Sequence, residues 1–128
     1  MAITIGNIGE EMNLNIKQGA TFGPLLFTMQ NPDNSAVNLT GCTVRGQIRK
    51  VPTKPAVAAA FTCSITNAAA GQYQLLLTEG QTAAIKAVDD PKSPENVYYW
   101  DLELVDSQSR VISLYWGKAT IFREITRV

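Results

Sequence analysis

Apolar and polar residues alternate in short segments along most of the chain, and turn residues separate these segments. The pattern is clearest in 42–50, where Val44, Gly46 and Ile48 fall on one face and polar or charged residues fall on the other. A period of two residues predicts β-strands with one buried face. The same reasoning predicts further strands at 12–17, 21–30, 57–66, 73–77, 98–105 and 112–122.

Two positions are expected to disturb this alternation. Pro24 cannot donate a hydrogen bond to a neighbouring strand, so the segment 21–30 is predicted to lie at a sheet edge or to carry a bulge. In the last strand the apolar residues change parity between Trp116 and Ala119, which predicts a β-bulge at Gly117. With the bulge at Gly117, Trp116 points into the core and Tyr115 points outward.

One short helix interrupts the strands. Thr78 and Gln81 have the spacing of a capping box, and the apolar run after them ends before Asp89-Asp90-Pro91. A helix of about two turns is not stable alone, so we expect it to close one end of a sheet sandwich. The chain is therefore predicted to be all-β, an immunoglobulin-like β-sandwich of about seven strands with one short helix.

Residues 1–11 are assigned to an N-terminal arm, and residues 12–128 to the sandwich domain. Ile3, Ile5 and Ile8 make the arm too apolar for a freely solvated tail, and they are candidate interface residues. The arm can add a strand to the sheet edge of a neighbouring molecule, or it can complete a sheet of its own domain. The sequence favours neither alternative.

The charge balance narrows the classes of partner. Of the 128 residues, 11 are Lys or Arg and 11 are Asp or Glu, so the formal net charge is zero. Nucleic-acid binding needs a surplus of cations, and we do not expect it. Neither a membrane span nor a secretory leader is expected. Cys42 and Cys63 are expected to be reduced thiols, with a disulfide between them left open.

Candidate chemistry is sparse. The chain has no histidine to serve as the base of a Ser-His or Cys-His nucleophile, and two cysteines cannot complete a zinc site. Asp101 and Glu103 are the one carboxylate pair to consider for glycoside hydrolysis. On an exposed strand face these carboxylates are instead expected to pair with Arg45, Arg49 or Lys118. We predict no enzymatic activity, no cofactor and no small-molecule substrate.

Aromatic residues gather in 98–100 and 115–116. About half of these rings are expected to pack in the core. Tyr99 and Tyr115 are expected to face solvent. An exposed aromatic strip suits a protein interface or sugar binding, so both tyrosines are candidate interface residues.

Several segments carry a resemblance to a known family: NIKQGATF at 15–22, NLTGCTVRGQIRK at 38–50, YWDLELVD at 99–106, Gly117 and EITR at 124–127. Together they resemble the small immunoglobulin-like β-sandwich virion proteins of tailed bacteriophages, which are usually associated with the tail or baseplate. The similarity extends over nearly the whole chain from residue 12 onward. Pro24 and the longer apolar arm depart from the family pattern.

The resemblance implies a non-enzymatic structural component of a virion, in the tail or baseplate. Such a protein assembles in many copies with other phage structural proteins, and it is found in the virion and, during assembly, in the host cytoplasm. Two alternatives stay open. One is a capsid decoration or head-to-tail protein, and the other is a carbohydrate- or receptor-binding module that uses Tyr99 and Tyr115. The family has no catalytic residues, so the resemblance implies none.

Overall fold

The computed structural model of the protein describes residues 9–125. Within this range the chain forms nine strands, one α-helix and one short 3-10 helix. Their bounds are β1 (Glu10–Glu11), β2 (Leu14–Lys17), β3 (Phe22–Thr28), β4 (Thr43–Arg49), β5 (Ala59–Ala60), β6 (Thr62–Asn67), β7 (Gln72–Leu77), α1 (Glu79–Ala84), η1 (Pro94–Asn96), β8 (Val97–Val105) and β9 (Val111–Phe122).

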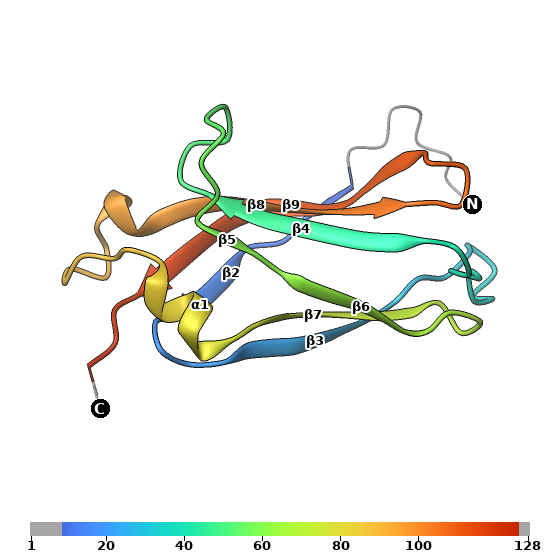
Figure 1. Cartoon of the computed structure of the whole chain (residues 1–128), viewed down its shortest axis with the longest axis horizontal. Coiled ribbons are helices and arrows are strands. Elements are labelled where there is room, and N and C mark those ends of the chain that lie inside the picture. Colours follow the sequence, from blue (N-terminus) through green and yellow to red (C-terminus); the bar gives the residue numbers. More distant parts are fainter. Residues whose placement is uncertain (1–8, 126–128) are drawn as a thin grey trace.

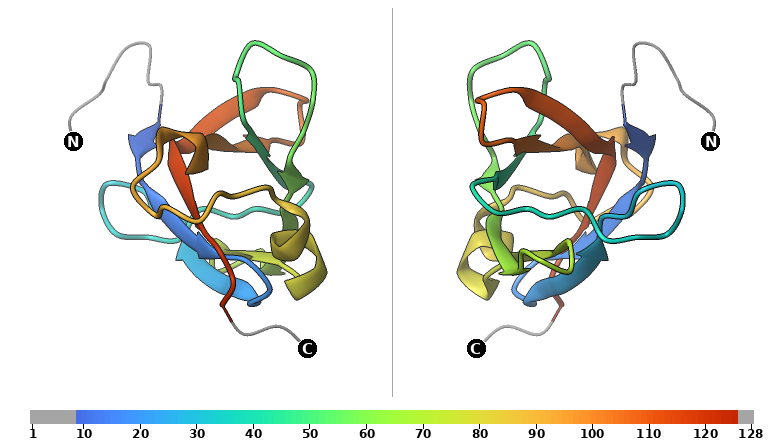
Figure 2. Two further views of the ribbon diagram at one scale, coloured as in Figure 1. Left: turned by 90° about the vertical axis from the view of Figure 1, so that its left-hand side faces the viewer. Right: turned by 90° about the vertical axis from the view of Figure 1, so that its right-hand side faces the viewer.

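The strands form two stacked sheets, seen from the side in Figure 1 and end-on in Figure 2. The larger sheet has the order β1–β9–β8–β4–β5, with β2 also paired to β9, and the smaller sheet has the order β3–β7–β6. Apolar side chains from the two inner faces fill the space between the layers and bury most of the apolar surface that stabilises the fold. The predicted all-β sandwich is confirmed. Its most deeply buried apolar side chains are those of Ile16, Leu39, Ile48, Leu75, Leu77, Ile85, Leu102, Ala119 and Ile121.

The predicted strand 57–66 is divided between the two sheets. Ala59 and Ala60 pair with β4 of the larger sheet, whereas from Thr62 onward the chain pairs with β7 of the smaller sheet. Phe61 lies at the crossing, where its backbone N–H donates to the Gly46 carbonyl at 2.9 Å. This division and the short strand β1 account for the two strands beyond the expected seven.

The described end of the N-terminal arm completes the sheet of its own domain. β1 pairs in parallel with β9 and places Glu11 opposite Trp116. After a break at Met12 and Asn13, β2 continues the parallel pairing along the same strand. All three candidate interface residues of this arm lie outside the described residues: Ile3, Ile5 and Ile8.

Pro24 occupies the kind of position predicted for it. β3 is an edge strand of the smaller sheet, and its pairing with β7 shifts register between Phe22 and Leu25. Because an edge strand has one side without a partner strand, the missing N–H of proline removes no ladder bond there. Both the edge position and the irregularity are confirmed.

Helix α1 closes one end of the sandwich, as expected (Figure 1). Thr78 is its N-cap: the Thr78 hydroxyl accepts from the Gln81 backbone N–H at 3.2 Å, and the Gln81 side chain accepts from the Thr78 backbone N–H at 2.9 Å. On the inner side the buried Thr82 hydroxyl donates to the Ala20 carbonyl at 2.9 Å. The capping box and this tertiary bond stabilise a helix that is too short to persist alone.

The hairpin of β8 and β9 carries its bulge at a different place from the one predicted. Gly117 pairs regularly with Trp100, and the register shift lies at Leu114, the extra residue between Ser113 and Tyr115. The predicted bulge at Gly117 is therefore wrong. The change of faces along β9 occurs, but it occurs earlier in the strand.

The earlier bulge exchanges the orientations expected for two neighbouring aromatic residues. Tyr115 packs against the core, with its ring centroid 5.2 Å from that of Phe27. Trp116 faces outward and is 36% exposed. The expectation that Tyr115 faces solvent is therefore wrong, because a one-residue shift of register turns every following side chain to the other face. Tyr99 is 40% exposed, as expected.

Gly117 is required for a close approach of backbone rather than for a bulge. The Met12 carbonyl oxygen accepts a hydrogen bond from the Trp100 indole N–H at 2.7 Å, and a Cβ added at Gly117 would overlap this same oxygen. The indole is 3% exposed and packs edge-on against Phe61, with ring centroids 5.9 Å apart. One carbonyl oxygen thus joins the N-terminal segment, β8 and β9.

Both cysteines are free and partly buried. The Cys63 thiol lies 3.8 Å from the Phe61 carbonyl oxygen, to which it donates, and burial raises the pKa of this thiol. Cys42 packs against the core from the segment before β4. The expectation of reduced thiols agrees with this arrangement.

We expect Gly117→Ala to lower the free energy of unfolding by about 2–3 kcal/mol, because the added methyl group must displace the Met12 carbonyl. Urea denaturation followed by far-UV circular dichroism measures the loss. Gly80→Ala is the matched control, since the nearest atom to its added Cβ is a hydroxyl 4.0 Å away. The control variant should lose no stability and gain up to about 1 kcal/mol. Equal stability of the two variants would contradict this role of Gly117.

Replacement of Trp100 by Phe should cost at least about 1–3 kcal/mol, because the Met12 carbonyl then lies buried without its donor. Trp116→Phe changes the same residue type on the outward face of the same sheet, and it should stay within about 0.5 kcal/mol of the parent protein. Chemical denaturation of both variants gives the comparison. A Trp100→Phe variant as stable as Trp116→Phe would show that the indole hydrogen bond is dispensable.

Candidate functional site

The outward face of the larger sheet carries a dense group of charged and aromatic side chains. Strand pairing orders them into rows that run across the sheet, because residues opposite one another on neighbouring strands point to the same side. The rows are Arg49–Tyr99–Lys118, Gln47–Asp101–Trp116–Glu11 and Arg45–Glu103.

This face is concave. An open cavity of about 810 Å³, here called the outer hollow, lies over β4, β8 and β9. The loop 50–58, which follows β4, stands above the sheet beside it and contributes Pro52 to its rim (Figure 1). The outward-facing polar and aromatic residues that line the outer hollow are Arg45, Gln47, Arg49, Tyr99, Asp101, Glu103 and Trp116.

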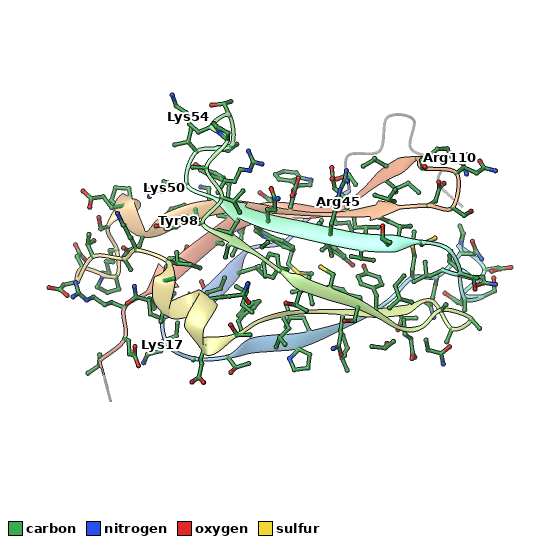
Figure 3. All side chains as sticks on the ribbon, in the orientation of Figure 1. Lys17, Arg45, Lys50, Lys54, Tyr98 and Arg110 are labelled. Carbon is green, nitrogen blue, oxygen red and sulfur yellow. The ribbon has the colours of Figure 1, made fainter. Side chains whose placement is uncertain are left out.

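Hydrogen bonds hold several of the polar side chains of the outer hollow in place. Arg45 Nε donates to Glu103 Oε1 at 2.9 Å in a cross-strand ion pair, which confirms Arg45 among the partners expected for these carboxylates. Figure 3 marks Arg45 on the outward side of β4. Arg49 is fixed from two directions: its Nη2 donates to Gln47 Oε1 at 2.9 Å, and its Nη1 donates to the Lys54 carbonyl at 2.8 Å.

Asp101 differs from its neighbour Glu103 in its surroundings. Partial burial opposite Trp116 raises the pKa of the Asp101 carboxyl, and the negative charge of Glu103 raises this pKa further. The nearby guanidinium groups of Arg49 and Arg45 act in the opposite direction but do not cancel the effect of burial. Asp101 is also exposed, so its carboxylate is accessible to a ligand on the wall of the outer hollow.

The structure brings only one of the described candidate interface residues, Tyr99, to the outer hollow. Tyr115 lies on the inner side of β9, and Trp116 takes the outward position in its place. Sequence analysis assigned Trp116 to the core because it placed the bulge after this residue. No glycine or proline marks the true bulge at Leu114, so the local sequence gave no sign of it.

The outward face of the smaller sheet has the opposite character. The strands β3, β6 and β7 contain no charged residue. Leu26 is 73% exposed on the edge strand β3 of this face, in a row with Gln74 and Ser64. This uncharged face was not predicted, although its signal is present in the sequence: no charged residue occurs in 18–32 or in 55–78.

A cluster of contacts around Lys50, at the end of the sandwich near α1, has a structural role (Figure 3). The Lys50 ammonium donates to the carbonyls of Glu95 and Val97. The same ammonium lies 4.8 Å from the centroid of the Tyr98 ring, whose hydroxyl donates to the Lys86 carbonyl at 2.7 Å. A cation at the final carbonyls of the 3-10 helix η1 stabilises its end, so we assign these contacts to holding the segment 86–97.

Neither a metal site nor a membrane-spanning helix is present in residues 9–125. Across this range no three His, Cys, Asp or Glu side chains are grouped so that they can hold a metal ion. The helices of the same range are too short and too polar to cross a membrane.

No protein-family model matches the chain, and a search of curated proteins found no significant match. Function is therefore inferred from the residues and from the geometry of the two outward faces.

Replacement of Asp101 by Asn should alter the pH dependence of stability. Because the pKa of Asp101 is raised in the folded protein, the folded state binds this proton more readily than the unfolded chain does. The stability contributed by Asp101 is therefore present below pH 3.8, the ordinary pKa of an aspartate. It is lost as the pH rises through the higher pKa that Asp101 has in the folded protein. Asp101→Asn removes this loss, so its stability relative to the parent protein should be greater at pH 7 than at pH 3.

Urea denaturation between about pH 3 and pH 8 measures this effect, and Glu103→Gln is the matched control. Glu103→Gln breaks the ion pair with Arg45 and should cost 0 to about 1 kcal/mol at pH 7. The result that contradicts this account of Asp101 is a stability difference for Asp101→Asn that stays constant with pH.

Proposed function

We propose that the chain is a non-enzymatic structural component of a tailed bacteriophage virion, in the tail or baseplate. It acts by protein–protein contacts with neighbouring subunits of the particle. In this proposal the protein resides in the virion, and in the host cytoplasm while particles assemble. No small-molecule substrate, cofactor or nucleic acid takes part.

The observation that carries the proposal is where the family-like segments lie in the fold. The segments 38–50 and 99–106 are far apart in the sequence, but they contain β4 and β8, which pair from Thr43 opposite Val105 to Arg49 opposite Tyr99. The segment 15–22 begins in β2, which pairs in parallel with β9 of the same sheet. Parts of three of the family-like segments therefore lie together in the larger sheet.

The uncharged face of the smaller sheet supports a role in assembly. The centres of protein interfaces are depleted in charged residues, because a charge that loses its water there must find a partner. The outward rows of β3, β7 and β6 offer hydroxyl, amide and apolar groups around the exposed Leu26. We assign this face to the contact with a neighbouring subunit.

The head of the particle is the alternative location for the same role. A capsid decoration or head-to-tail protein would use the same uncharged face, so this alternative changes the neighbour and not the mechanism. Localisation of the chain in a reconstruction of the intact virion distinguishes the two locations.

Leu26→Glu should reduce incorporation of the chain into virions about tenfold or more, because it places a charge within the otherwise uncharged contact face. A phage that lacks the gene is supplied with each variant from a plasmid, and the chain is quantified by mass spectrometry in purified particles. Val111→Glu is the matched control: Val111 is 52% exposed near the hairpin end of the larger sheet, away from this face.

The two ways in which this experiment can fail have different meanings. Purified virions that never contain the parent chain would refute the structural role itself. Normal incorporation of Leu26→Glu would leave the chain in the virion but would refute the assignment of the contact face.

A further inference from the structure

The outer hollow has the dimensions and rigidity of a ligand site. Its volume of about 810 Å³ lies within the usual range of about 300–1,000 Å³ for small-molecule sites. Its floor consists of paired strands rather than loops, so its side chains keep fixed positions relative to one another. The loop 50–58 stands beside it and obstructs the approach of a second flat sheet (Figures 1 and 2).

Two exposed aromatic rings mark the floor of the outer hollow. Trp116 is opposite Asp101, and Tyr99 is opposite Lys118, so the two residues are diagonal neighbours on adjacent strands, a position at which backbones lie about 7–8 Å apart. They are 36% and 40% exposed. Aromatic rings on a polar surface offer apolar faces, and the C–H faces of a sugar ring are the apolar counterpart in an otherwise hydroxylated molecule.

Planar hydrogen-bonding groups lie beside the rings. The Asp101 carboxylate is an acceptor next to Trp116, and the Gln47 side chain follows in the same row. Because Gln47 Oε1 accepts from Arg49, the groups that Gln47 can offer to a ligand are the N–H donors of its amide. An acceptor and a donor next to each other, on one side of an aromatic ring, match the vicinal hydroxyl groups of a saccharide.

Charge selects among the ligands that such a site can hold. The charged side chains that line the outer hollow are Arg45, Arg49, Asp101 and Glu103, two positive and two negative. Since Arg45 and Glu103 neutralise each other at 2.9 Å, the hollow has no excess of either sign to attract a polyanion or a polycation. The ligand class that fits is polar, rich in hydroxyl groups and uncharged.

We propose that the outer hollow binds a neutral saccharide. Trp116 and Tyr99 stack on the sugar rings, and Asp101 and Gln47 bond to the hydroxyl groups. This binding site lies on the opposite side of the sandwich from the uncharged face of the smaller sheet, and it does not depend on the proposed role in the virion.

The test uses the full 128-residue chain and a panel of neutral hexasaccharides, namely those of α-1,4-glucose, β-1,4-glucose, β-1,4-mannose and β-1,4-N-acetylglucosamine. Two-dimensional NMR of the isotope-labelled protein resolves the two indole N–H groups. With at least one hexasaccharide, the indole signal of Trp116 should shift and saturate with a Kd of about 1 mM or below, while that of the buried Trp100 stays in place.

Variants separate the site from the fold. Trp116→Ala and Tyr99→Ala should each weaken binding about tenfold or more, and Asp101→Asn should weaken it by less. Leu26→Ser, on the outward face of the other sheet, is the matched control and should bind as the parent chain does. Unchanged amide spectra away from β8 and β9 show that each variant is folded.

Two results would overturn the proposal. The first is that no hexasaccharide in the panel moves the Trp116 signal at about 10 mM. The second is that this signal shifts with protein concentration alone, and that sedimentation velocity detects a dimer which Trp116→Ala abolishes. The outer hollow would then be covered by a second copy of the chain. Neither result bears on incorporation into virions, which is measured with Leu26→Glu.

Discussion

The hydrogen bond between the Trp100 indole and the Met12 carbonyl is the interaction on which the larger sheet depends. The N-terminal segment turns inward at Met12 between two short strands, and its carbonyl oxygen would be buried without a partner if the indole did not donate to it. Gly117 leaves the room that this oxygen needs. Three distant parts of the sequence thus meet at one atom, beneath the rows of the outward face.

The two sheets share one core but differ in the chemistry of their outward faces. Charged side chains gather on the larger sheet, where each row contains a cation, a carboxylate or both. The strands of the smaller sheet contain none. This division fits a protein that is attached by one face and remains accessible on the other, since burying the charged face would require partners for each ion.

The sequence was sufficient for the elements whose signals are local. Alternation at Val44 and Ile48 predicted strand β4, and the Thr78–Gln81 spacing predicted the helix cap. The sequence was not sufficient for features that depend on residues far apart in the chain. The change of sheet at Phe61 and the need for glycine at 117 depend on backbone from other strands, and neither leaves a local pattern.

The candidate site was predictable only in part for the same reason. Tyr99 was expected on the surface because the alternation of β8 is regular. Trp116 was not expected on the surface, because a bulge with no glycine or proline reverses the faces of β9 before the chain reaches Trp116. The rows of the outer hollow follow from pairing between strands about fifty residues apart, which periodicity within one strand does not reveal.

The parallel pairing of the first strands with the last one determines how the domain responds to mechanical load. β2 and β9 run in the same direction, so tension applied to the two chain ends pulls these strands along each other from opposite ends. All the hydrogen bonds between them are then strained together in shear, whereas an antiparallel terminal pair can open one bond at a time. The sandwich should therefore resist stretching along its long axis.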